Sequence, residues 1–139
     1  MFECFIWLMA SDLPGLHWEE DDPSAEEEAF EEGVYHRVAK KIEEACEASG
    51  VPFWALQLRD AGVCIAVSGA YTAPRPRDAP ETHREFLRDL AQTAPATYGV
   101  LYMQDPEKAR DNGEFTVLKL ANGSISESRE LLVRPSAHR

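Results

Sequence analysis

The chain has 139 residues, of which 44% are hydrophobic, and its 25 acidic against 14 basic side chains leave a formal net charge of −11. This length and apolar content predict one folded domain over residues 1–139 and exclude a chain that is disordered throughout. The excess of acids disfavours nucleic acid and anionic membranes as partners, because like charges repel.

The first part of the chain predicts a strand followed by a long helix. The apolar run Phe2–Met9 is typical of a strand that is central in a sheet or covered on both faces. After a loop, Ser24 and Glu27 form a capping-box pattern, which predicts a helix over 24–48. One side of this helix repeats apolar side chains every four residues: Phe30, Val34, Val38, Ile42 and Cys46.

The middle of the chain predicts a hairpin and a second helix. Two apolar runs, Val51–Arg59 and Val63–Tyr71, are separated by three turn-forming residues and predict paired strands. A proline-rich loop over 73–80 follows. A helix is then predicted over 79–94, with an apolar stripe that includes Phe86 and Leu90.

Two more strands, Thr97–Gln104 and Glu114–Ala121, complete the predicted order β-α-β-β-α-β-β. The alternation after Asn122-Gly123 is too weak to assign. Two helices on one face of a mixed or antiparallel sheet give an α+β two-layer sandwich, for which a ferredoxin-like arrangement with an added hairpin strand is our first expectation. Tyr98 and Tyr102 point to the same face of their strand, where we expect them to pack under a helix, and Gly99 between them indicates a close backbone approach.

The sequence offers little catalytic chemistry. The four histidines and three cysteines lack the spacing of metal ligands, and no glycine-rich phosphate loop or nucleophile motif is present. His83 beside Glu81 could form a base with an orienting carboxylate, although a solvated helix face explains the pair better. Asp12 and Asp60 fall in turns, where aspartate bonds to the backbone. We therefore expect no enzyme activity, no metal and no cofactor.

The compartment is predicted from the cysteines and the first residues. Cys4, Cys46 and Cys64 are far apart in apolar settings, which is typical of buried, reduced thiols in the cytoplasm. The segment Met1–Ala10 lacks the basic start of a secretory signal, and no apolar run is as long as a membrane helix.

An acidic tract with one tryptophan is the most unusual feature. The tract lies within residues 1–50, which hold 14 of the 25 acids and only 3 of the 14 bases. A negative field beside an aromatic anchor can steer and hold a basic protein. A solvated loop and helix start, with acids favouring the helix dipole, is the alternative. The candidate partner-binding residues are Trp18, Glu19, Glu20, Asp21, Asp22, Glu26, Glu27 and Glu31, with the loop around Arg75 as the second choice.

Several blocks in order along the chain resemble the immunity protein 7 family of bacterial polymorphic toxin systems. The most distinctive is the YG-x-LY strand with its acidic turn, over 97–105; the others are Phe2-Glu3 with Trp7, Val67-Ser68-Gly69, Glu114-Phe115 with Val117, and Glu130–Pro135. The chain departs from the family at Phe5-Ile6, where relatives have His-Gly, and at Ala73-Pro74-Arg75, where they have Asn-His-Arg. The resemblance implies a small cytoplasmic protein that protects its own cell by binding and blocking a cognate toxin domain.

Three functions remain open at this point. The first is an immunity protein, monomeric or weakly dimeric, that inhibits a basic toxin such as a nuclease. The second is a small hydrolase that uses carboxylates and His83, which would require a deep pocket with His83 bonded to Glu81. The third is an adaptor that assembles with itself through a sheet edge.

Overall fold

A computed structural model describes residues 3–12, 35–73, 79–104 and 114–131. The elements in chain order are β1 (Glu3–Ala10), α2 (Tyr35–Ser49), the 3-10 helix η2 (Phe53–Ala55), β2 (Leu56–Asp60), β3 (Ile65–Thr72), α3 (Ala79–Thr93), β4 (Tyr98–Gln104), β5 (Glu114–Ala121) and β6 (Ser124–Leu131).

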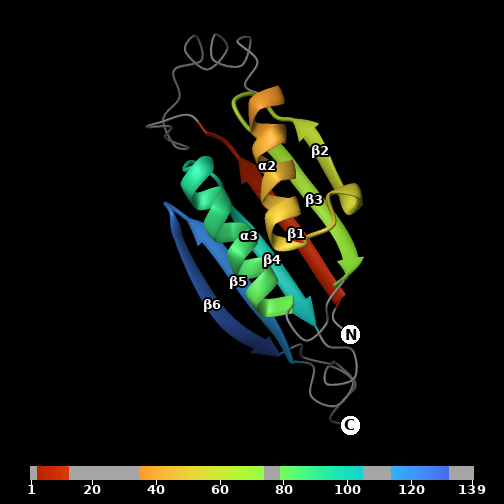
Figure 1. The fold of residues 1–139 in the computed structure, drawn as a ribbon. Coiled ribbons are helices and arrows are strands. Elements are labelled where there is room, and N and C mark those ends of the chain that lie inside the picture. The colour runs from red at the N-terminus through yellow and green to blue at the C-terminus, as the bar shows by residue number, and fades with distance from the viewer. Residues whose placement is uncertain (1–2, 13–34, 74–78, 105–113, 132–139) are drawn as a thin grey trace.

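The six strands form one sheet in the order β2-β3-β1-β4-β5-β6, and every neighbouring pair is antiparallel. Helices α2 and α3 lie side by side on the same face of this sheet (Figure 1). The predicted α+β architecture is confirmed, whereas the ferredoxin-like comparison stays a prediction. Strand β1 lies in the middle of the sheet, which is one of the two positions that its apolar run predicted.

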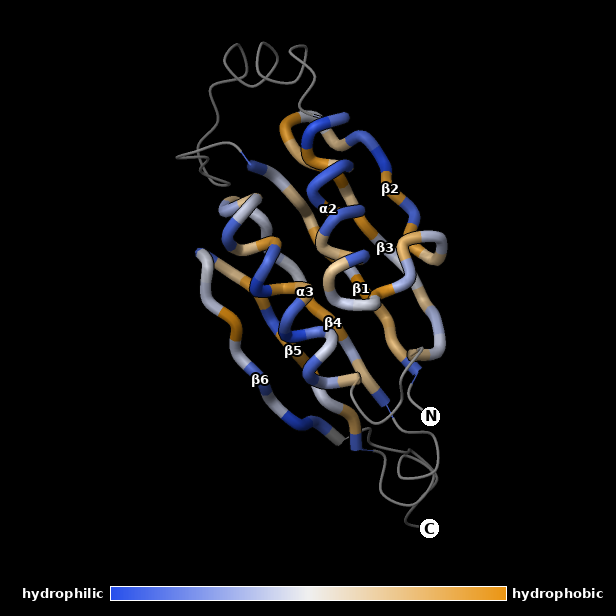
Figure 2. Tube along the Cα trace, in the orientation of Figure 1, coloured by the Kyte–Doolittle hydropathy of each residue, from blue (hydrophilic) through white to orange (hydrophobic). Residues whose placement is uncertain are grey.

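The core lies between the sheet and the two helices. Val38, Ile42 and Cys46 of α2 are buried against it, as are Phe86 and Leu90 of α3, so the helical phase predicted for these positions is confirmed. Hydrophilic residues follow the outer turns of both helices, whereas apolar residues gather in the strands beneath them (Figure 2). Burial of the apolar stripe of α2 therefore provides the free energy that holds this amphipathic helix on the sheet, while its charged side stays in water. The predicted start of this helix, with Phe30 and Val34, lies outside the described residues.

The hairpin prediction is confirmed with one correction. Strands β2 and β3 pair, and the Asp60 carboxylate accepts a bond of 3.0 Å from the Gly62 N–H in their turn. However, the predicted strand over Val51–Arg59 begins only at Leu56. Pro52 has no N–H for a strand ladder, and its carbonyl accepts a bond of 3.1 Å from Ala55, which closes a 3-10 turn instead.

Strand β6 is the element that the sequence did not predict. It is an edge strand with mostly hydrophilic residues (Figure 2), and Ile125 is its only described side chain packed against the core. Asn122 and Gly123 connect it to β5 with φ values of 53° and 77°, the conformation of a two-residue hairpin turn. This Asn-Gly pair is the signal that could have found the strand.

Gly99 brings β4 close to β1, as expected. Its φ is +154°, and a Cβ built there would lie 2.2 Å from the Trp7 carbonyl oxygen. No side chain fits at this distance, so glycine is required where the two central strands meet.

Candidate functional site

The acidic candidate site cannot be placed in the fold. Trp18, Arg75 and the acids Glu19, Glu20, Asp21, Asp22, Glu26, Glu27 and Glu31 all lie outside the described residues. Their role in binding a partner stays a prediction from charge and sequence.

His83 does not lie on a solvated helix face, and that expectation is wrong. Its side chain is fully buried, with Nδ1 2.6 Å from the Ala79 carbonyl oxygen and Nε2 2.5 Å from the Tyr71 hydroxyl. The carbonyl can only accept, so Nδ1 donates to it and the neutral Nε2 accepts from Tyr71. Burial lowers the pKa of His83, outweighing the opposite effect of the carbonyl. The pair joins α3 to β3 inside the protein.

The geometry that the hydrolase hypothesis required is therefore missing at His83. Glu81 does not bond to His83; it lies on the surface and accepts a bond of 3.2 Å from Arg84. A buried imidazole with both nitrogens already bonded has no proton route to a substrate. Its role is structural.

The three cysteines are free and buried, as predicted. Burial raises the pKa of the Cys4 and Cys46 thiols to about 12, so neither forms a thiolate near neutral pH. Cys64 sits at the end of the β2–β3 turn, where its Sγ lies 3.5 Å from the Ala61 carbonyl oxygen. Across the described part of the chain, no group of three or more His, Cys, Asp or Glu side chains could hold a metal ion.

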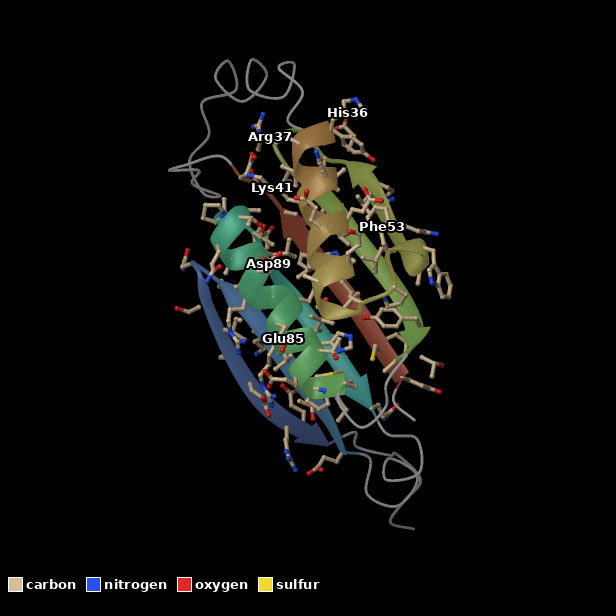
Figure 3. The ribbon with its side chains drawn as sticks, viewed as in Figure 1. His36, Arg37, Lys41, Phe53, Glu85 and Asp89 are labelled. Atoms are coloured by element: carbon tan, nitrogen blue, oxygen red, sulfur yellow. The ribbon has the colours of Figure 1, made fainter. Side chains whose placement is uncertain are left out.

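Asp12 has a different role from the backbone bonding expected of a turn residue. Its nearly buried carboxylate accepts two bonds from the Arg37 guanidinium, at 2.5 and 3.1 Å, and one of 2.9 Å from the Lys41 ammonium. Both cations project from the first turns of α2 toward the end of β1 (Figure 3). Burial alone would raise the pKa of Asp12, but these hydrogen bonds and charges bring it below 3.8. The sequence could not show this cluster because its members are 25 and 29 residues apart.

The sheet face opposite α2 and α3, called the open face below, carries the most unusual surface among the described residues. In β1 the buried side chains of Cys4, Ile6 and Leu8 alternate with side chains on the open face. Phe5 and Trp7 are 44% and 47% exposed there, and Tyr102 of β4 is 38% exposed. A contiguous patch of exposed apolar side chains, unlike a single exposed one, is typical of an interaction surface.

These aromatic side chains lie together on three neighbouring strands. Trp7 contacts Tyr98 edge to face at 5.9 Å between ring centroids, and Tyr102 contacts Phe115 of β5 at 5.6 Å. Phe5 stands directly opposite Tyr102 in the β1–β4 register and shares its face of β1 with Trp7, so the two pairs lie next to each other on the open face. We call Phe5, Trp7, Tyr98, Tyr102 and Phe115 the aromatic ridge.

The expected packing of Tyr98 and Tyr102 under a helix is wrong. The two tyrosines do share a face, but Leu101 and Met103, which alternate with Tyr102, are the side chains buried under the helices. The two alternating sets of side chains in β4 are both apolar, so the sequence of this strand does not say which set faces the core. The same ambiguity hid Phe5 and Trp7 in the apolar run of β1, although their aromatic alternation with smaller side chains was a usable signal.

Small side chains flank the aromatic ridge. On β3 the residues opposite Met9, Trp7 and Phe5 are Ala66, Ser68 and Ala70, and on β6 three serines point to the open face. The charged side chains that the strand register places on this face are two acids and two bases, namely Glu3, Arg59, Lys119 and Glu130. The open face is therefore neutral, with aromatic rings standing above short neighbours.

In a comparison with protein families, the profile of a family described as immunity protein 7 matches residues 1–138. Neither the curated proteins nor the solved structures contain a match. In the described part of the chain, the helices are too short or too polar to cross a membrane.

Proposed function

The chain belongs to the immunity protein 7 family, and from this premise we propose that it binds a cognate toxin domain in the cytoplasm and neutralises it there. The family match over residues 1–138 is the observation that carries the proposal. The protein acts as an inhibitor rather than as an enzyme, since a stoichiometric complex is enough to block a toxin. The buried, fully bonded His83 and the thiols of high pKa agree with this role.

The toxin is expected to be basic, and a nuclease fits best. A nuclease needs a cationic groove for the phosphate backbone, and such a groove attracts a protein with a net charge of −11. The acids Glu19, Glu20, Asp21 and Asp22 supply the field in this proposal, with Trp18 as a contact. Charge of this kind acts mainly on the rate of encounter.

The test is complex formation with a defined toxin domain. If the reading frame immediately upstream encodes the C-terminal toxin domain of a secreted protein, that domain is the probe, co-expressed with this chain and purified. We expect a stable complex by size-exclusion chromatography with light scattering, and survival of cells that express the toxin only when this chain is present. A toxin domain that neither binds the chain nor is neutralised by it would contradict the proposal.

The acidic tract has a separate kinetic test. Replacing Glu19, Glu20, Asp21 and Asp22 by their amides should slow association with the toxin domain and flatten its dependence on salt. Trp18→Ala should instead speed dissociation and cost about 2 kcal/mol or more if Trp18 is a hot spot. If the amide variant associates at the same rate as the unchanged chain at both low and physiological salt, the tract is only a solvated surface. The loop around Arg75 is then the next candidate site.

A further inference from the structure

We infer that the open face of the sheet is the surface on which the toxin domain docks, with Phe5, Trp7 and Tyr102 as its central anchors. The inference rests on the proposed function and extends it by assigning a surface. It comes from the exposed aromatic ridge rather than from the acidic tract, so each of the two can fail without the other.

The part of the fold that the structure describes gives no reason for the aromatic ridge. A side chain needed for folding packs into the core, and in β1 that task falls to Cys4, Ile6 and Leu8, whose exposed fractions are 0, 4 and 0%. Phe5 and Trp7 point the other way and stay almost half exposed. Neither of the two described helices covers them. Exposed aromatic rings cost free energy in water, and a partner that buries them recovers it.

The arrangement of the open face is that of a protein interface. Aromatic residues are enriched at the centre of interfaces and charged residues are depleted there. Here the centre is the aromatic ridge on β1, β4 and β5, and its small neighbours such as Ser68 and Ala70 leave the sides of the rings free to be covered. Backbone groups on the central strands are already paired within the sheet, so a partner meets no unsatisfied backbone N–H or C=O group in the middle.

The area also fits a specific complex. The six strands have 5 to 8 residues, and at about 3.3 Å per residue and about 4.8 Å between strands they give a face of roughly 700 Å². A standard interface buries about 800 Å² on each partner. The open face therefore supplies most of one such interface without any change in the fold.

Charge decides between the two possible occupants. Two copies of this chain each carry a net charge of −11 and repel one another as whole molecules, and the neutral open face offers nothing to offset that repulsion. A basic toxin domain is instead attracted by the whole molecule. The toxin surface that meets the aromatic ridge would be an apolar patch beside the toxin's cationic groove. The acids of this chain then guide the encounter, and the aromatic ridge holds the complex.

The test uses the full chain and the toxin domain from the reading frame upstream. Trp7→Ala should weaken the equilibrium affinity at least about 30-fold, mainly through faster dissociation. Ala70→Arg is the second variant: it removes no ring but places a long cation beside Phe5 on the open face, and should weaken binding to a similar extent. Circular dichroism and thermal melting of each free variant establish that the fold is kept.

Trp54→Ala is the matched control. Trp54 is 85% exposed, more than Trp7, but belongs to η2 and not to the open face, so its loss should leave toxin affinity within about twofold of the unchanged chain. If the unchanged chain binds the toxin and both Trp7→Ala and Ala70→Arg bind equally well while folded, the inference is overturned and the proposed function stands. If the unchanged chain does not bind at all, the proposed function itself fails. A concentration-dependent dimer that Ala70→Arg dissociates would overturn the toxin as occupant in favour of a second copy.

Discussion

Acidification should destabilise this protein through one buried imidazole. His83 is fully buried and neutral in the fold, and burial holds its pKa below the ordinary value of 6.5. The unfolded chain titrates with the ordinary pKa, so below pH 6.5 it takes up a proton that the folded protein does not. The unfolded state then binds more protons, and the free energy of unfolding falls as the pH falls. This contribution is fully present above pH 6.5.

The slope can reach about 1.4 kcal/mol per pH unit between the ordinary pKa and the lower one of the folded state. Protonation would also turn Nε2 into a donor aimed at the Tyr71 hydroxyl 2.5 Å away, which must then give up donating to it. At neutral pH the same bond can be removed by Tyr71→Phe, which keeps the ring and orphans the buried nitrogen. That variant should lose about 1–3 kcal/mol.

The assay is urea unfolding followed by circular dichroism at several values between pH 5 and 7.5, a range in which most surface carboxylates stay ionised. The free energy of unfolding is compared between the unchanged chain and His83→Gln, which cannot titrate. His36→Gln, which removes an exposed imidazole from α2, controls for the loss of a histidine as such. Parallel stability profiles for the unchanged chain and His83→Gln would refute the reasoning.

Three further perturbations test other parts of the fold. Asp12→Asn should cost about 1–3 kcal/mol of stability, because Arg37 and Lys41 lose an ionised, nearly buried partner. The pKa of Asp12 is lowered in the folded protein, so its stabilisation is lost as the pH falls below about 3.8. The difference in unfolding free energy between the variant and the unchanged chain should therefore narrow at low pH. Equal denaturant midpoints for the two at neutral pH would contradict this. Leu90→Ala should cost about 2–4 kcal/mol through a core cavity, and a loss below half a kcal/mol in urea unfolding would show that α3 is packed differently. Gly99→Ala should lower the melting temperature by more than either, since the new Cβ would meet backbone at 2.2 Å; an unchanged melting temperature would refute the close approach of β4 to β1.

Local patterns determined the elements of this protein. The four-residue repeat through Val38 and Ile42, the stripe through Phe86 and Leu90, and the turn at Asp60–Gly62 each depend on side chains close together in the chain. The family resemblance was also available from local blocks, above all the one around Tyr98 to Tyr102, and the match over residues 1–138 confirms it. Where the local pattern was weak, as in the polar edge strand β6, no element was predicted.

Only the tertiary structure decided which faces are buried and which distant side chains meet. An apolar strand such as β1 has two faces of similar hydrophobicity, and which one the helices cover depends on the whole sheet; Phe5 and Trp7 therefore proved to be exposed. His83 is polar and close to other polar residues in sequence, yet Tyr71 and the Ala79 carbonyl satisfy both its nitrogens in the core. Burial of a polar group is favourable only when such partners arrive from elsewhere in the fold, and a sequence read in short windows does not contain that information.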